Sequence, residues 1–167
     1  MIIVCDASPI CYLLLIGEIQ LLPHLYGKVL IPQVIQNELA DERSPTVVQG
    51  WISQPPKWLV IQTVDVVSDS ALDNLDSGER DAIMLVVPRA DLIIIDDLLA
   101  RQMASSLHLR VTGLLGVLDE AGRQKLVDFS GAIARLQQTT FRASSKLIQS
   151  LLQQRQAEDK GRYTLLM

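Results

Sequence analysis

Short apolar segments alternate with longer amphipathic ones along the chain. The apolar segments are rich in branched residues and end at polar residues or proline, which is the pattern of strands buried on both faces. Four of them are clear, at residues 2–5, 28–31, 58–61 and 92–95, and a shorter one lies at 109–111. Such alternation implies parallel strands joined by right-handed crossovers. We therefore expect an α/β fold with a central, mostly parallel sheet of four to five strands.

The amphipathic segments predict helices whose starts are marked by proline or by capping residues. Ser8 is expected to cap the first helix with Pro9 in its first position, which leaves Asp6 without a capping duty. Pro23 is expected to limit a short second helix. Residues 157–167 are expected to form a loose polar tail. The expected helices span residues 9–16, 18–22, 33–39, 45–51, 79–87, 98–107, 128 or 130 to 138, and 144–154, and another follows Thr112.

Composition supports one packed domain. Hydrophobic residues make up 49% of the 167 residues and aromatic residues only 4%, which is typical of an aliphatic α/β core. We assign residues 1–140 to this domain and residues 141–167 to a C-terminal helix and tail packed on it or extending from it. The N-terminus lacks a basic leader, and the apolar run at 10–16 is shorter than the roughly 20 residues that span a bilayer. A cytoplasmic protein without a membrane segment is therefore expected.

Charge restricts the ways in which this chain could meet a nucleic acid. The formal net charge is −4, and no block of Lys or Arg occurs. A broad nucleic-acid surface is therefore not indicated, and a nuclease of this composition would meet phosphates through metal ions and scattered Arg residues.

Acidic residues follow two of the predicted strands. Asp6 ends the first strand, and Asp96 and Asp97 end the strand at 92–95. In a parallel sheet all carboxyl ends lie along one edge, which is where ligands bind in open α/β folds. One residue of the Asp96-Asp97 pair can cap the next helix, but the second needs another explanation.

Three more acids lie on the expected helices. Glu38 shares a face with apolar residues, so it is either a ligand on the inward face or an edge residue that reaches water. Glu79 either belongs to a capping box with Asp76 or faces the site. Asp81 lies about 200° around the helix from Glu79, so the two cannot share one face well.

Several carboxylates at one edge would repel each other unless a divalent cation lay between them. Oxygen ligands of this kind suit Mg²⁺ or Mn²⁺, and the chain has no Cys or His cluster for zinc. The chemistry that fits is metal-assisted hydrolysis of a phosphodiester, in which the metal orients a water and stabilises developing charge.

Four stretches of the chain each contain an acidic residue in a short motif. They are Ile-Val-Cys-Asp6-Ala-Ser-Pro, Gln-Asn-Glu38-Leu, Leu-Asp-Ser-Gly-Glu79-Arg-Asp81-Ala-Ile and Ile-Ile-Asp96-Asp97-Leu-Leu-Ala-Arg101. In order and spacing they resemble the motifs of PIN-domain proteins, in particular the VapC-like branch found beside a small antitoxin. The resemblance runs from Ile2 to about Leu126, and Thr-Gly-Leu-Leu-Gly-Val-Leu at 112–118 adds to it.

The resemblance implies a three-layer α/β/α sandwich. It also implies a Mg²⁺- or Mn²⁺-dependent ribonuclease with an RNA substrate, a small antitoxin partner and a homodimeric state. It leaves open whether Glu79 or Asp81 is the third acid, and it favours Asp97 over Asp96 as the fourth. The implied catalytic residues are Asp6, Glu38, Glu79, Asp81 and Asp97, and the implied metal ligands are Asp6, Glu38, Asp96 and Asp97.

Two other classes of function compete with a nuclease. The first is a non-catalytic binding or regulatory module of the same fold that acts through protein partners by its apolar C-terminal helix. The second is a phosphotransfer fold. It is disfavoured because Ser8 stands where an aspartate phosphatase has its second acid, and because a receiver's acid pair and lysine are missing.

Overall fold

A computed structural model describes residues 1–64, 72–86 and 91–166 of the chain. These residues divide into two compact units, Met1–Leu114 and Leu115–Met167. The strands are β1 (Ile3–Cys5), β2 (Val29–Pro32), β3 (Leu59–Gln62), β4 (Leu92–Ile94) and β5 (Val111–Thr112). The helices between them are α1 (Ala7–Leu15), α2 (Leu21–Tyr26), α3 (Gln33–Ala40), α4 (Thr46–Ser53), α5 (Ser77–Val86) and α6 (Leu98–Ser106).

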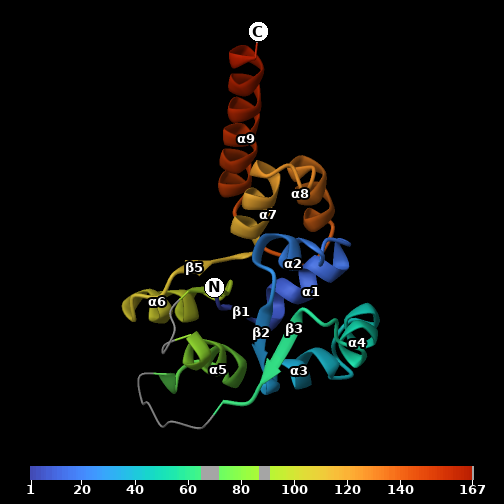
Figure 1. The fold of residues 1–167 in the computed structure, drawn as a ribbon, viewed down its shortest axis with the longest axis vertical. Coiled ribbons are helices and arrows are strands. Elements are labelled where there is room, and N and C mark those ends of the chain that lie inside the picture. Colours follow the sequence, from blue (N-terminus) through green and yellow to red (C-terminus); the bar gives the residue numbers. More distant parts are fainter. Residues whose placement is uncertain (65–71, 87–90, 167) are drawn as a thin grey trace. The chain divides into compact units, whose positions relative to one another are not determined.

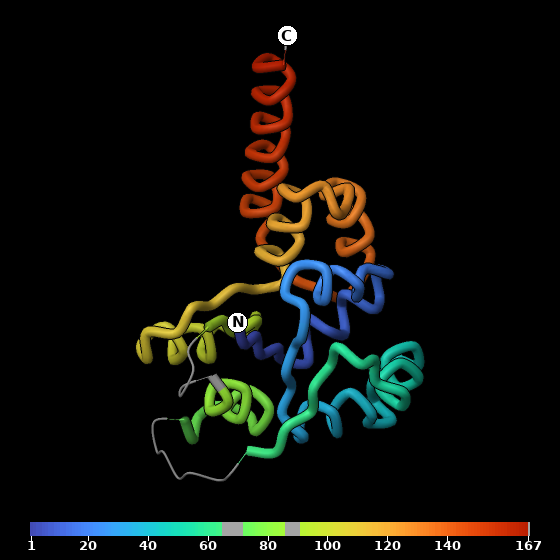
Figure 2. Tube along the Cα trace, in the orientation of Figure 1, coloured from blue at the N-terminus to red at the C-terminus, as the bar shows by residue number. Residues whose placement is uncertain are grey.

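The first unit is built on a five-stranded parallel sheet with the order β3-β2-β1-β4-β5, so the predicted α/β/α sandwich is confirmed. From β1 the chain moves outward to β2 and β3, returns through α5 to β4, and ends at β5 (Figure 2). Right-handed crossovers in opposite directions place helices on opposite faces. Figure 1 accordingly shows α3 and α4 on one side of the sheet and α5 and α6 on the other.

The sheet brings the carboxyl ends of β1 and β4 to the same level. Cys5 pairs with Ile94, and the backbone N–H of Asp6 donates to the Ile94 carbonyl at 2.9 Å. The chain leaves β1 and β4 in opposite directions, so this point is the topological switch at which open α/β sheets bind ligands. The strands are held by a core of fully buried branched residues, among them Ile3, Ile93 and Ile94.

Two predicted helix starts are wrong, and for the same reason. The first helix begins at Ala7, so Asp6 rather than Ser8 occupies the N-cap position, and α2 spans Leu21–Tyr26 rather than ending before Pro23. In both helices proline lies at the third position, where its missing N–H would have had no intrahelical partner. The Asp6 side chain nevertheless makes no capping hydrogen bond.

The second unit contains α7 (Leu114–Arg123), α8 (Phe129–Gln137) and α9 (Ser145–Leu165). The predicted tail at 157–167 is wrong as far as Leu165, because α9 continues through it. Arg155 on α9 is buried, its guanidinium lies 2.5 Å from Asp119 on α7, and it also pairs with Glu158 at 2.9 Å. These ion pairs hold the middle of the helix, and residues that favour helices carry it onward.

Smaller shifts occur at two other places in the first unit. The last strand lies at Val111–Thr112, slightly later than the expected 109–111, and the expected end of one helix at Val87 lies outside the described residues. Among the helices that the structure describes, none is long and apolar enough to cross a membrane.

We expect Ile94→Ala to destabilise the protein strongly, because Ile94 is fully buried on a central strand beside β1. Truncation in such a position costs about 2–5 kcal/mol of unfolding free energy, measurable by urea denaturation. Leu98→Ala on α6 is the matched control, since Leu98 is 69% exposed and its loss should change stability by no more than about 0.5 kcal/mol. Equal losses in the two variants would contradict this account of the core.

Candidate active site

Asp6 lies at the centre of the acidic edge. It follows β1 directly, is only 7% exposed, and occupies the N-cap position of α1 without capping it. Burial raises the pKa of Asp6 to about 7, the Ala7 backbone N–H opposes part of the rise, and the carboxylates of Glu79, Asp76 and Glu38 add to it. A buried carboxyl with acidic neighbours is in an unfavourable position for a structural residue and a suitable one for a cation ligand.

Glu38 reaches this edge from α3. The residue is exposed over much of its surface, as the edge interpretation expected, but its carboxylate lies against the start of α5. A Cβ placed on Gly78 would lie 3.2 Å from Glu38 Oε2 and 3.4 Å from Asp76 Oδ1. A Cβ at this position would crowd the Glu38 carboxylate, so the absence of a side chain at Gly78 lets Glu38 lie close to the start of α5. Burial raises the pKa of Glu38, and the Asp76 charge adds to the rise.

Glu79 combines the two roles that the sequence left open. It forms the predicted capping box, because its N–H donates to Asp76 Oδ1 at 2.8 Å and the Asp76 N–H donates to its carboxylate at 3.3 Å. Glu79 also faces the site. Burial raises its pKa to about 7, with further increases from Asp76, Asp97 and Glu38 and some opposition from the Asp76 N–H.

Asp81 lies elsewhere on α5. Its carboxylate lies 3.5 Å from Arg80 Nε, and it does not contribute to the raised pKa of Asp6, Glu38 or Glu79. The structure therefore brings Glu79, and not Asp81, toward the other acids.

The two acids after β4 make different contacts. Asp97 is the N-cap of α6, and its Oδ1 accepts a hydrogen bond from Ala100 N at 2.9 Å. Asp96 Oδ1 accepts from Leu114 N at 3.0 Å, while its Oδ2 is buried and has no hydrogen-bond partner among the described residues. Burial raises the pKa of Asp96, although Leu114 N and the Arg101 charge oppose the rise.

Gly113 allows this arrangement. A Cβ at that position would lie 2.5 Å from both Asp96 Oδ1 and Arg101 Nη1, closer than any real side chain could approach. Arg101 also donates to the Ile95 carbonyl at 3.3 Å, which fixes its guanidinium beside the end of β4. Asp96 and Arg101 can therefore both lie against the backbone just after β5 because position 113 carries no side chain.

The acids lie close enough to act on one another's pKa, but their side chains do not form a complete coordination site. In the part of the chain that the structure describes, no three His, Cys, Asp or Glu side chains are grouped closely enough to hold an ion as they lie. The donor set still fits a hard cation, since it consists of carboxylates, and Asp96 Oδ2 is a buried oxygen without a partner. Closing a site around a cation would require rotation of the acidic side chains.

Asp76 is the site residue that the sequence analysis did not single out. Its role in the capping box was expected, but its carboxylate also acts on Asp6, Glu38 and Glu79. A signal was present, because a helix start that lies over a strand end brings its capping acid toward the same edge.

These observations define an α/β/α domain with carboxylates gathered at its topological switch. The chain belongs to the PIN-domain family, because a family model of that description (DUF3368, PIN domain) matches residues 2–157. PIN domains are generally nucleases, so membership supports a hydrolase that acts on nucleic acid. No curated protein and no solved structure matches the sequence.

The raised pKa of Asp6 should make the metal-free protein less stable as pH rises. Asp6 ionises near pH 3.8 when unfolded and near 7 when folded, so its stabilising proton is fully present below about pH 4 and lost toward pH 7. In EDTA, Asp6→Asn should exceed the wild type in stability by roughly 2–4 kcal/mol at pH 8 and match it near pH 4.

Urea denaturation across this pH range measures the effect. The control is Asp73→Asn, which replaces an exposed carboxylate and should keep the wild-type pH dependence. If Asp6→Asn followed the wild-type stability curve at every pH, the raised pKa of Asp6 would be contradicted.

Proposed function

We propose that the protein is a metal-dependent endoribonuclease that hydrolyses RNA phosphodiester bonds. The observation that carries the proposal is the buried Asp6 at the switch between β1 and β4, with further carboxylates around it. Membership of the PIN-domain family supports the same class of reaction.

Asp6, Glu38 and one acid of the Asp96-Asp97 pair are proposed to hold Mg²⁺ or Mn²⁺. When bound there, such an ion would lower the pKa of a water and offset charge on the phosphate oxygens. The protein's own contribution is to hold the acids in place. α1, α3 and α6 hold the acids on regular elements, and the negative charges of Glu79, Asp76 and Glu38 around Asp6 favour a cation.

For the third acid we propose Glu79 rather than Asp81. Glu79 lies where the charges of Asp76, Asp97 and Glu38 act on it, and its raised pKa suits a group that accepts a proton near neutral pH. Asp81 is instead paired with Arg80.

For the fourth acid we propose different roles for Asp97 and Asp96. Asp97 caps α6 through Oδ1 and acts on Glu79, which keeps it as the site-facing acid. Asp96 has an unpartnered buried oxygen and is held by Leu114 N, so it is the better placed to join an ion from inside.

The biological setting we propose is that of a VapC-like toxin in the cytoplasm, acting as a homodimer and inhibited by a small antitoxin. The resemblance of the acidic motifs to that branch supports this setting. Induction of the chain alone should arrest growth, and co-expression of the small protein encoded beside it should relieve the arrest. A non-catalytic PIN-fold module acting through protein partners is the alternative. In that case neither the growth arrest nor its relief would depend on Asp6.

Asp6→Asn is expected to reduce RNA cleavage by at least about 100-fold, because it removes a charged ligand from the centre of the site. Single-turnover cleavage of a labelled single-stranded RNA in Mn²⁺ measures the loss. The matched control, Asp73→Asn, should cleave at the wild-type rate. If Asp6→Asn cleaves as fast as the wild type, the nuclease proposal fails.

Glu79→Gln and Asp81→Asn should differ sharply in the same assay. We expect Glu79→Gln to lose about 10–1,000-fold in rate, since it removes the acid that faces the site, and Asp81→Asn to lose less than about threefold. Both substitutions remove one charge from α5 and leave its length and packing intact. The reverse order would assign the third acid to Asp81.

A further inference from the structure

A polar groove extends from the acidic edge past the end of α3. It has a volume of about 660 Å³, and its walls include Glu38 and Asp76 from the candidate site. Beyond Glu38 and Asp76 the lining continues to Asn37, Ser44 and the paired Asp41 and Arg43. Arg43 is the cationic side chain among the described residues of this lining. Most of the lining side chains can hydrogen-bond, which suits a polar ligand rather than an apolar one.

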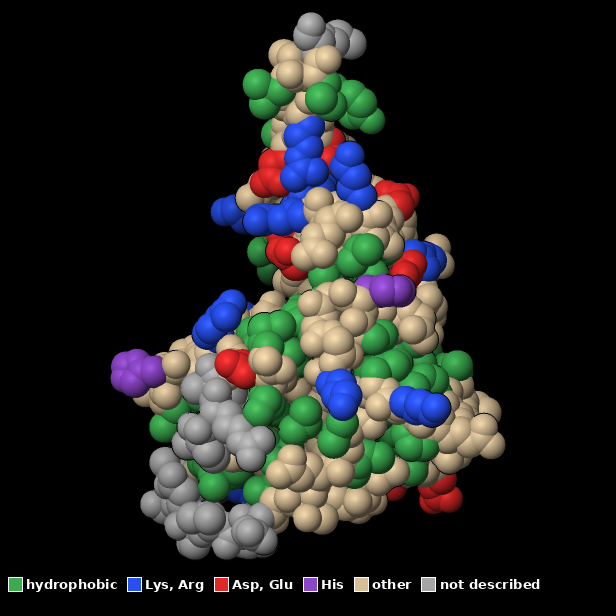
Figure 3. Space-filling view, in the orientation of Figure 1, with side chains coloured by type: hydrophobic (Ala, Val, Ile, Leu, Met, Phe, Trp, Pro, Cys, Tyr) green, Lys and Arg blue, Asp and Glu red, His purple; other side chains and the backbone are tan. Residues whose placement is uncertain are grey.

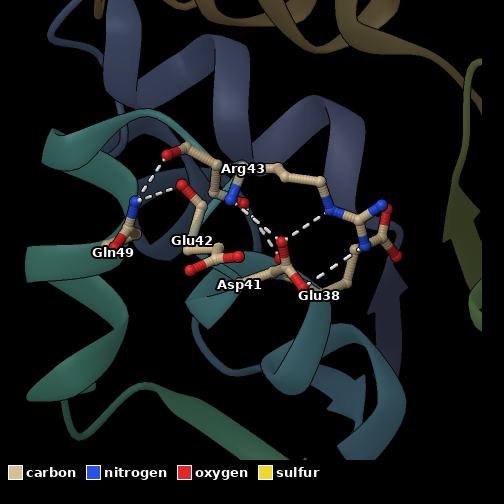
Figure 4. A network of polar contacts seen from close by, with 6 residues as sticks. Glu38, Asp41, Glu42, Arg43 and Gln49 are labelled. Carbon is tan, nitrogen blue, oxygen red and sulfur yellow. Dashed lines mark hydrogen bonds and ion pairs between the residues drawn. The ribbon is translucent and has the colours of Figure 1, made fainter.

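The loop that carries Arg43 is fixed by its own hydrogen bonds (Figure 4). The backbone N–H of Arg43 donates to Asp41 Oδ1 at 2.9 Å, and Ser44 Oγ donates to the Glu38 carbonyl at 2.9 Å. Gln49 on α4 clamps the loop from outside, through bonds to the carbonyls of Ser44 at 2.6 Å and Glu42 at 3.2 Å. An exposed loop held so firmly presents its side chains in a fixed position.

The Arg43 side chain is both held and available. Asp41 accepts hydrogen bonds from its Nε at 2.8 Å and its Nη2 at 3.3 Å, so one edge of the guanidinium is occupied. A guanidinium has five N–H donors in a planar fork, and the remaining edge can bind a second oxyanion with two parallel bonds. The side chain is 88% exposed, so solvent can be replaced there by a ligand.

The surrounding charge explains why one arginine matters here. Residues 1–114 contain 14 Asp and Glu but only 7 Lys and Arg, and Lys and Arg lie singly on the first unit's face in Figure 3. An RNA entering the acidic edge would meet repulsion on both sides of the cleaved bond. A fixed cation in the groove that leads away from the acids is where a neighbouring phosphate would find attraction.

We propose that Arg43 is a substrate-positioning residue that binds a backbone phosphate adjacent to the one that is hydrolysed. The binding uses the guanidinium edge that Asp41 leaves free. This inference rests on the proposed nuclease function, and it adds a phosphate subsite to it and a direction in which the RNA leaves the acidic edge.

Steady-state cleavage of a short single-stranded RNA tests the subsite. Arg43→Gln should raise KM about tenfold or more and leave kcat within about twofold, because the lost contact is to a phosphate that does not react. The slope of log KM against log salt should fall in magnitude by about 0.7, the value for one phosphate contact on a single strand. Arg43→Lys should restore the salt slope and part of the affinity.

Two matched variants separate phosphate binding from simpler effects. Arg123→Gln removes an arginine that is also paired with an aspartate, Asp119, but does not line the groove, and it should behave as the wild type. Arg43→Gln also leaves Asp41 unpaired, so the double variant Arg43→Gln/Asp41→Asn restores the wild-type net charge. If Arg43 binds phosphate, the double variant stays about as weak as Arg43→Gln. Thermal unfolding confirms that each variant is folded.

The outcomes also distinguish this inference from the proposed function. Full recovery of KM in the double variant, an effect of Arg43→Gln on kcat alone, or parity with Arg123→Gln would each overturn the subsite while leaving the nuclease intact. If the wild type cleaves no RNA, anisotropy of a labelled RNA in EDTA gives the Kd of wild type and Arg43→Gln instead. Equal Kd values, or no binding by either, would reject the subsite as well.

Discussion

The repulsion among carboxylates around Asp6 is the constraint on which the rest of the site depends. Hydrophobic burial places β1 at the centre of the sheet, and the chain direction then puts Asp6 at its carboxyl end beside β4. Nothing in the protein's own described contacts neutralises this group, and Glu38, Asp76 and Glu79 raise its pKa further. The fold therefore carries an electrostatic cost that a bound cation would remove.

The layered fold could be predicted from the sequence because each buried strand is a short branched segment and each is followed by a helix. The errors arose where a local rule had two solutions. Proline is accepted anywhere in the first turn of a helix, so Pro9 could occupy the first or the third position, and Pro23 could end one helix or lie in the first turn of the next. The predicted end of α9 is too early because the polar residues of this helix resemble a tail. The ion pair between Arg155 and Asp119, which are far apart in sequence, anchors the helix.

The candidate site was predictable to the extent that it depends on strand ends, and less so where it depends on side-chain direction. Asp6 and the pair at 96–97 follow from topology alone. Which of Glu79 and Asp81 lies toward the other acids depends on the orientation of α5, which the sequence does not give. Asp76 was expected only as a capping residue, although its charge also acts on Glu79. Arg43 carried no motif, because its position follows from a hydrogen-bonded loop rather than from a periodic pattern.

The two adjacent acids after β4, Asp96 and Asp97, make different hydrogen bonds. Capping uses one oxygen of Asp97, and the backbone of Leu114 uses one oxygen of Asp96. Each carboxylate thus retains an oxygen, but only that of Asp96 is buried without a partner, beside a position that glycine keeps open. An unsatisfied buried carboxylate oxygen is costly, and a bound cation at this position would offset that cost. The two acids thus differ in their contacts, since Asp97 caps α6 and Asp96 keeps a buried oxygen that no described group satisfies.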